Sequence, residues 1–175
     1  MATKPEILDD AIEVLRRGEP FTIDAVAREA GLTKPGVMHH FATKEALVLA
    51  VVDRIVERWL TVLRERAGED SSPTERLRAY VEYAVTGEFD QSDLALLVDV
   101  RLRDMLAAQW TRRMNPWFGT EITGTPRQRG ALRAARLLAD GAWFNKGLGI
   151  PTVRGDEEDA VYSVAMRLLE EGGAK

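Results

Sequence analysis

The chain has 175 residues, of which 45% are hydrophobic and 30% charged, and its formal net charge is −4 at pH 7. This composition is typical of a globular protein. The absence of cysteine excludes disulfide scaffolds, thiolate zinc sites and cysteine nucleophiles, and it is typical of the reducing cytoplasm, where we expect this protein. No apolar run approaches the ~20 residues of a membrane span, and we see no signal peptide.

Helical periodicity runs through almost every long segment, and no segment alternates at period two, so we expect an all-α fold. Three capping boxes, in which two side chains satisfy the first backbone N–H groups, mark helix starts at Thr3–Glu6, Ser72–Glu75 and Thr125–Gln128. Glycines typical of helix ends follow at Gly18, Gly31, Gly68 and Gly87. The predicted helices cover about residues 4–17, 23–30, 34–41, 44–66, 73–87, 92–108, 110–118, 126–148 and 156–171.

The predicted helix at 44–66 has an unusually wide apolar stripe. Its apolar residues come in adjacent pairs every four positions: Leu47/Val48, Val51/Val52, Ile55/Val56 and Trp59/Leu60. A helix that packs against a single neighbouring element needs a narrower apolar stripe than this one. We therefore interpret this helix as a connector between a small head and a larger body.

Residues 23–41 are predicted to form two short helices joined by a tight turn at Gly31, where glycine permits a left-handed backbone. We expect Val26, Val37 and Phe41 to pack these helices together. This is the arrangement of a helix-turn-helix, whose second helix presents its N-terminal end to a DNA major groove. Spacing alone leaves an ordinary helical corner as an equal alternative.

The sequence of residues 7–51 favours the helix-turn-helix. It reads ILDDAIEVLRRGEPFTIDAVAREAGLTKPGVMHHFATKEALVLAV and resembles, without gaps, the DNA-binding head of the tetracycline-repressor (TetR) family. The resemblance implies a three-helix DNA-binding domain at residues 1–50. The long fourth helix would join it to an all-helical ligand-binding and dimerisation domain at 51–175.

The resemblance also implies which residues contact DNA. Thr22 matches a phosphate-contacting helix cap, and Lys44 matches the lysine that the family uses as a phosphate clamp. Thr33 and Lys34 open the recognition helix, where a hydroxyl and an ammonium can meet phosphate or a guanine edge. The implied DNA contacts are Thr22, Thr33, Lys34, Pro35, Gly36, His39, His40 and Lys44.

Three features of the head depart from the family pattern or from DNA binders in general. Met38 stands where the family commonly has tyrosine, and Asp24 stands at a place that is often basic. Residues 1–50 contain six Lys or Arg and eight Asp or Glu, so we expect modest DNA affinity and a shallow salt dependence. We expect no metal at His39 and His40, because adjacent helical residues point ~100° apart.

Large apolar residues are concentrated in the second half of the chain. By resemblance they would line a cavity for a small hydrophobic or planar effector, although each could equally be plain core. The candidate ligand contacts are Met105, Trp110, Met114, Trp117, Phe118, Trp143 and Phe144.

The last two predicted helices carry more apolar residues than one body can cover. The helix at 126–148 has one line through Leu132, Ala135, Ala139 and Ala142 and another through Leu137, Leu138, Gly141, Phe144 and Leu148. The resemblance implies that these two helices form a four-helix dimer bundle. We expect Ala139 and Val164 to lie in the seam.

The first functional hypothesis is a transcriptional regulator, most readily a repressor, that binds a palindromic operator as a homodimer and is released by an effector. The alternative is a helical small-molecule carrier or adaptor that does not bind DNA, which the acidic head and Met38 favour. We do not expect an enzyme, because the sequence has no glycine-rich phosphate loop, nucleophile elbow or evident carboxylate pair. No cofactor, metal or membrane partner is expected.

Overall fold

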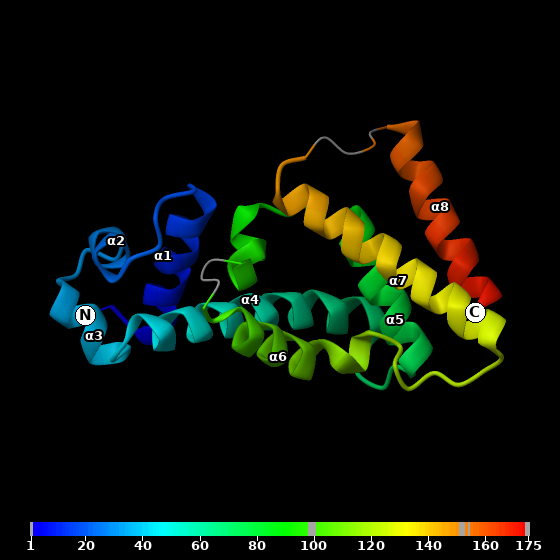
Figure 1. Ribbon diagram of the computed structural model, residues 1–175, viewed down its shortest axis with the longest axis horizontal. Coiled ribbons are helices and arrows are strands. Elements are labelled where there is room, and N and C mark those ends of the chain that lie inside the picture. Colours follow the sequence, from blue (N-terminus) through cyan, green and yellow to red (C-terminus); the bar gives the residue numbers. More distant parts are fainter. Residues whose placement is uncertain (1, 98–100, 151–152, 154, 174–175) are drawn as a thin grey trace. The chain divides into compact units, whose positions relative to one another are not determined.

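The computed structural model describes residues 2–97, 101–150, 153 and 155–173, and within these ranges it contains helices and no strand (Figure 1). The expected all-α fold is confirmed. The described elements are α1 (Lys4–Arg16), α2 (Ile23–Glu29), α3 (Lys34–His40), α4 (Lys44–Ala67), α5 (Pro73–Thr86), the 3₁₀ helix η1 (Gln91–Leu97), α6 (Arg103–Met114), the 3₁₀ helix η2 (Asn115–Trp117), α7 (Pro126–Gly147) and α8 (Asp156–Glu171). Over the same ranges, none of these helices has the length and apolarity that a bilayer span requires.

Local side-chain signals set most helix starts. All three predicted capping boxes form, with the hydroxyls of Thr3, Ser72 and Thr125 accepting the N–H of the third helical residue. Gly31 and Gly68, which follow the ends of α2 and α4, have φ of 62° and 85°. A residue with a Cβ is strained at such angles, so glycine is the natural residue at these helix ends.

The expected helices at 92–108 and 110–118 are wrong. The chain instead forms η1, then α6 and η2; residues 98–100, which the first expected helix includes, lie outside the described ranges. Asp90 explains the tight start of η1, because its carboxylate accepts the backbone N–H of Ser92 at 2.8 Å and the guanidinium of Arg16 at 2.7 Å. The Asp90 carboxylate thus forms a local turn with Ser92 and is held in place by Arg16 of α1. This turn competes with formation of an α-helix.

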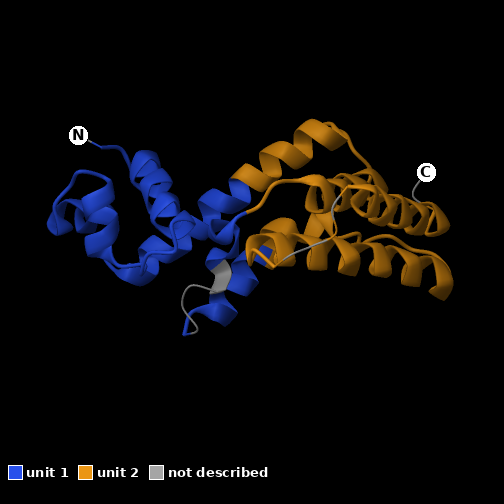
Figure 2. Ribbon diagram, turned by 90° about the horizontal axis from the view of Figure 1, so that it is seen from above, with its two compact units in different colours: residues 1–57, 90–110 blue, residues 58–89, 111–175 orange. Residues whose placement is uncertain are grey.

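Residues 1–57 and 90–110 form one compact unit, unit 1 (Figure 2). Here α1, α2 and α3 pack around side chains with no exposed surface, among them Ile7, Val26 and Val37. The segment from residue 90 is attached within this unit, since Gln91 donates to the carbonyl of Arg16 and Gln109 donates to that of Leu49.

Residues 58–89 and 111–175 form unit 2, in which α5 packs against α7 and α8. Its centre is an aromatic cluster around Trp59. The indole of Trp59, with 1% of its surface exposed, contacts four rings, with centroid distances between 4.9 and 5.8 Å: Tyr80, Tyr83, Phe89 and Trp143. The helix α4 begins in unit 1 and ends in unit 2, so one continuous helix carries residues of both cores.

Candidate nucleic-acid interface and ligand groove

Two capped helices and a tight turn make up the helix-turn-helix. The hydroxyl of Thr22 accepts the N–H of Ala25 at 3.0 Å at the start of α2, and that of Thr33 accepts the N–H of Gly36 at 3.2 Å at the start of α3. Between the helices, the N–H of Leu32 donates to the carbonyl of Ala27 at 2.8 Å. The turn therefore closes by backbone hydrogen bonds and holds α3 in a defined position on α2.

The packing of α3 decides which of its side chains face solvent. Val37 is fully buried, whereas Met38 is 42% exposed. The residues predicted to contact DNA divide into an exposed group, Thr22, Thr33, Lys34, Pro35 and His39, and a half-buried group, Gly36, His40 and Lys44. Within unit 1 the structure thus brings the α3 residues onto one solvent-facing surface that starts at the N-terminal end of the helix.

Most basic side chains of the head are engaged by carboxylates of the head. Arg17 pairs with Glu29 at 2.5 Å and Arg28 with Glu19 at 2.7 Å. The hydrogen bond from Arg17 lowers the pKa of the Glu29 carboxyl below its ordinary value. At the helix-turn-helix itself, Lys34 pairs with Asp24 at 2.9 Å. This surface therefore presents little uncompensated positive charge.

The two histidines lie edge to face, with ring centroids 5.4 Å apart. Across the described parts of the chain, no three His, Asp or Glu side chains gather into a group that could hold a metal ion.

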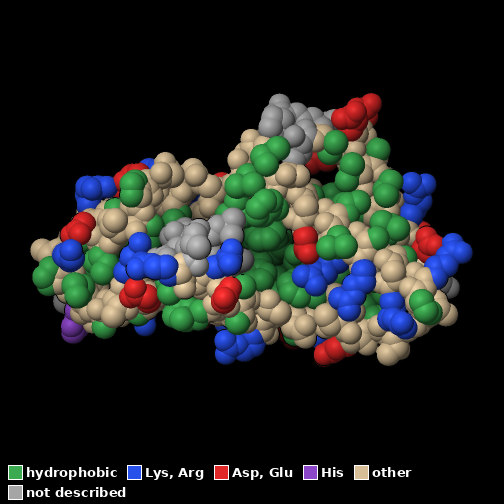
Figure 3. Space-filling model, viewed as in Figure 1, with side chains coloured by type: hydrophobic (Ala, Val, Ile, Leu, Met, Phe, Trp, Pro, Cys, Tyr) green, Lys and Arg blue, Asp and Glu red, His purple; other side chains and the backbone are tan. Residues whose placement is uncertain are grey.

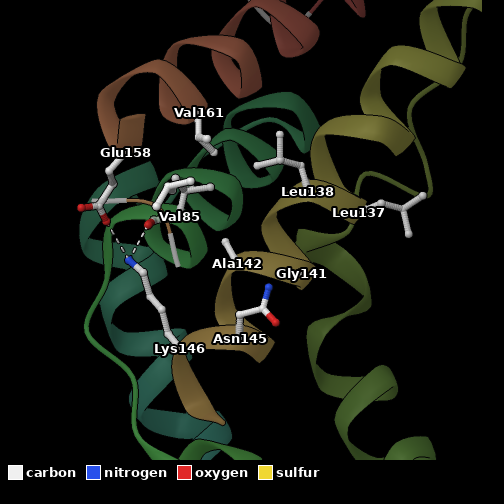
Figure 4. Close-up of a pocket in the computed structure, with 10 residues that line it drawn as sticks. Val85, Leu137, Leu138, Gly141, Ala142, Asn145, Lys146, Glu158 and Val161 are labelled. Carbon is white, nitrogen blue, oxygen red and sulfur yellow. Dashed lines mark hydrogen bonds and ion pairs between the residues drawn. The ribbon is translucent and has the colours of Figure 1, made fainter. Parts of the chain in front are cut away.

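Unit 2 contains an apolar groove of about 420 Å³ between α7 and α8 (Figure 4). Its lining comes from α5, α7, α8 and the loop before α8: Val85, Leu137, Leu138, Gly141, Ala142, Asn145, Lys146, Val153, Glu158 and Val161. Lys146 closes one end, since its ammonium donates to the carbonyls of Val85 at 2.7 Å and Gly87 at 3.1 Å and pairs with Glu158 at 3.1 Å. The groove is thus an apolar surface with one polar, fully engaged end.

The residues predicted to contact a ligand do not share one cavity in the structure. Met105, 51% exposed, and Trp110 belong to unit 1, whereas the other five belong to unit 2. Met114 is completely buried, and Trp117 lines a separate, more polar pocket with Arg64 and Arg76.

Two of the aromatic candidates, Trp143 and Phe144, are neighbours of groove residues in the sequence of α7. Trp143 packs on Trp59 in the aromatic cluster, and Phe144 is 40% exposed. Both sit on α7 between the groove residues Ala142 and Asn145. The groove itself was not predicted from the sequence, although Leu138, Ala142 and Lys146 follow the i, i+4 spacing of one helix face.

The outward face of α7 carries an unusual stripe. Five residues of α7 and its C-cap residue Leu148 are exposed, and their spacing of alternating four and three residues places them along one side of the helix: Gly130, Ala134, Leu137, Gly141, Phe144 and Leu148. Leu137 is 70% exposed. In the space-filling view, hydrophobic side chains gather over the region of α7 and α8 (Figure 3).

The prediction that Ala139 lies in the dimer seam is wrong. Ala139 has no exposed surface and packs into the core of its own chain, so it cannot contact a second copy. Val164 on α8 is 38% exposed and agrees with an outward position. The sequence pattern showed two apolar lines on α7, and only the three-dimensional packing reveals that the line through Leu137 faces outward.

Comparisons with known proteins agree with this architecture. The family model "Bacterial regulatory proteins, tetR family" matches residues 7–51, and the model "Tetracyclin repressor-like, C-terminal domain" matches residues 74–170. No curated protein sequence matches the chain.

Three solved structures share the fold at low sequence identity. A putative TetR-family transcriptional regulator from Rhodococcus sp. has a TM-score of 0.67 at 16% identity, covering 95% of each chain. The multidrug binding protein EbrR complexed with ethidium has a TM-score of 0.56 at 18% identity, covering 96% of this chain and 99% of its own. FadR from Bacillus subtilis in complex with stearoyl-CoA has a TM-score of 0.59 at 14% identity, covering 96% of each chain. With the two family models matching its head and most of its body, the chain belongs to the TetR family of transcriptional regulators.

Proposed function

We propose that this protein is a repressor that binds a palindromic operator as a homodimer and releases it when a small apolar or planar effector binds. The observation that carries the proposal is the helix-turn-helix, in which α3 is held on α2 and exposes the start of its own sequence to solvent. Such a helix can enter a major groove with its N-terminal residues at the base edges.

The contacts with DNA follow from the chemistry of the exposed surface. Thr22 and Thr33 use their oxygen atoms as acceptors for helix caps, so each hydroxyl hydrogen remains available to a phosphate oxygen. Pro35 and Gly36 allow close approach to the groove floor. His39, His40 and Lys44 supply N–H donors for phosphate, and Lys34 can reach a guanine edge.

The outward stripe of α7 supports self-association. A Cβ added at Gly130 or Gly141 would meet no atom of the chain within 4 Å, so the fold of one chain does not require glycine at either position. Glycine inside a helix costs about 1 kcal/mol relative to alanine. Close crossing of a second copy of α7 would account for both glycines and would cover Leu137, Phe144 and Leu148. A two-fold dimer then presents two α3 helices to two half-sites.

We place the effector at unit 2, against the apolar groove and the adjoining aromatic cluster. Leu137 and Gly141 on the rim of the groove, together with Phe144, belong to the proposed seam, so we place the effector against the walls from α5 and α8 and Leu138. These apolar walls favour an apolar ligand, and Trp143 offers a flat surface for a planar one. The similar structures with ethidium and with stearoyl-CoA are consistent with both classes. Of the other candidate contacts, Phe118 lies against Tyr80 of the same unit. Met105, Trp110, Met114 and Trp117 stay proposed from the resemblance alone.

Selection of DNA from a library tests the proposal. Purified protein is incubated with duplexes carrying a random 30-base-pair core, and bound duplexes are amplified and sequenced over several rounds. We expect enrichment of an inverted repeat with half-sites about one or two helical turns apart. Enrichment of no sequence at moderate salt, together with retained binding of apolar ligands, would instead indicate the carrier.

A further inference from the structure

The start of the recognition helix carries an ion pair at the surface proposed to face DNA. Asp24 is the second residue of α2 and Lys34 the first residue of α3, and the lysine ammonium donates to the aspartate carboxylate at 2.9 Å. The two side chains are 66% and 52% exposed, respectively. The contact therefore joins the two helices at their N-terminal ends, in full reach of a bound duplex.

This pair controls the charge that α3 can offer. Lys34 is the only lysine or arginine in α3, whose sequence is KPGVMHH. The neighbouring arginines of the head, Arg17 and Arg28, are engaged by Glu29 and Glu19. Attraction of lysine and arginine to phosphates supplies nearly all of the affinity for arbitrary DNA. A carboxylate that holds Lys34 therefore removes part of that attraction and adds repulsion.

The ion pair does not prevent Lys34 from recognising a base. An ammonium has three donors, and Asp24 uses one of them, so the others can donate to the O6 and N7 atoms of a guanine. The carboxylate can at the same time accept from a cytosine amine. The intact pair thus opposes phosphate contacts on every sequence while remaining compatible with a specific base pair.

We propose that Asp24 is a specificity-determining residue, which weakens binding to arbitrary DNA by competing with phosphates for Lys34 and so raises the preference for the operator. This inference rests on the proposed DNA-binding function. It assigns to Asp24 a role in discrimination rather than in affinity.

Asp24→Asn tests the inference, because it keeps the size of the side chain and removes its charge. Fluorescence anisotropy measures binding to a duplex selected from the random library and to a scrambled duplex of equal length and composition, between 50 and 200 mM salt. We expect affinity for the scrambled duplex to rise about tenfold at 50 mM salt. The logarithmic salt slope should steepen by about 0.9, the value for one added phosphate contact. The ratio of the two affinities should fall.

Two further variants separate the ion pair from a general change of charge. Glu29→Gln changes the net charge equally, but Arg17 keeps its ion pairs with Glu13 at 3.4 Å and Glu19 at 3.8 Å, so this variant should leave the affinity ratio unchanged. In a Lys34→Gln background, Asp24→Asn should no longer steepen the salt slope. An unchanged ratio in Asp24→Asn, an equal effect of Glu29→Gln, or an undiminished effect without Lys34 would each overturn the inference. Failure of the wild type to select any duplex would contradict the proposed function instead.

Discussion

The phenol of Tyr80 is buried in unit 2, with 1% of its surface exposed, and donates a hydrogen bond to Asp140 at 2.6 Å. Asp140 also pairs with Arg136 at 3.3 Å, and that guanidinium lies 3.7 Å from the centroid of the Phe118 ring. These four residues connect α5 with α7 and with the segment before it. The network satisfies the hydroxyl of Tyr80, which would be costly to bury alone.

Tyr80→Phe should lower the free energy of unfolding by about 1–3 kcal/mol at pH 8, because Asp140 no longer accepts the hydrogen bond that the neutral phenol of Tyr80 donates. Burial, and next the charge of Asp140, raise the pKa of Tyr80 well above its ordinary value of 10.0. The folded chain then holds the proton more tightly than the unfolded chain, so this stabilisation is present below pH 10 and lost as the pH rises further. Urea denaturation at pH 8 and at pH 11 should show a smaller difference between wild type and variant at the higher pH. An equal difference at both values would contradict this account.

Lys44, the first residue of α4, is predicted to hold a phosphate. Lys44→Ala should weaken binding to selected and scrambled duplexes by a similar factor and make the logarithmic salt slope shallower by about one. Its effect on the slope is opposite to that expected for Asp24→Asn, and it leaves the affinity ratio intact. A loss confined to one base pair would mean that Lys44 reads a base instead.

At the scale of single elements, α7 has two apolar faces, one that packs in the core of its own chain and one that is exposed. Ala135 and Ala139 have no exposed surface and join the core of their own chain. The opposite stripe, from Gly130 to Leu148, is exposed along its length. A helix that is apolar on both sides needs a second layer of protein, which one chain does not provide within the described ranges. The outward stripe is therefore the proposed seam.

Leu137→Lys should convert the proposed dimer into monomers, because an unpaired ammonium in a dry interface costs several kcal/mol. Leu137 is 70% exposed in the single chain, so the variant should fold normally. Sedimentation velocity over a range of concentrations measures the change. Ser163→Lys is the control, since Ser163 is exposed on α8 among polar residues spaced along one side, such as Asp159 and Arg167. If Leu137→Lys stays dimeric, α7 is not the seam.

At the scale of the whole molecule, features with a local cause could be predicted from the sequence. Capping boxes and glycines after helix ends are encoded within a few residues, and they gave correct starts for α1, α5 and α7. The break between η1 and α6 could not be predicted, because no glycine or proline occurs between Gly87 and Pro116. The tight start of η1 could not be predicted either, because the ion pair between Asp90 and Arg16 joins residues that are 74 positions apart in the sequence.

The candidate sites divide in the same way into features with a local cause and features that depend on contacts between distant parts of the sequence. The start of α3 could be predicted from the cap at Thr33 and from the continuous resemblance around it. The groove in unit 2 could not, because its walls come from three helices and a loop whose packing no local pattern specifies. The ion pair of Asp24 with Lys34 joins α2 to α3 through residues ten positions apart. It could not be predicted either, because it depends on how the two helices pack.

If an effector controls DNA binding as proposed, α4 is the element that would link the two events. Its first residues belong to unit 1, and Trp59 near its other end belongs to the aromatic cluster of unit 2. An effector can change DNA affinity only if it binds the DNA-competent and DNA-incompetent states differently. The coupling is reciprocal, so operator DNA must weaken effector binding by the same factor, typically ~5–150-fold.

Trp59→Phe should therefore reduce this coupling more than it changes either binding step, whereas Trp143→Phe should chiefly weaken the effector. Phenylalanine is preferred because truncation of the buried Trp59 to alanine would cost about 3–5 kcal/mol of stability. Candidate effectors are found by thermal-shift screening of apolar and planar compounds, beginning with ethidium and stearoyl-CoA. The compound that binds is then titrated into wild type and both variants, with and without the selected duplex. Equal effector affinity in free and DNA-bound wild type would show that α4 transmits no signal and that an effector does not control this regulator.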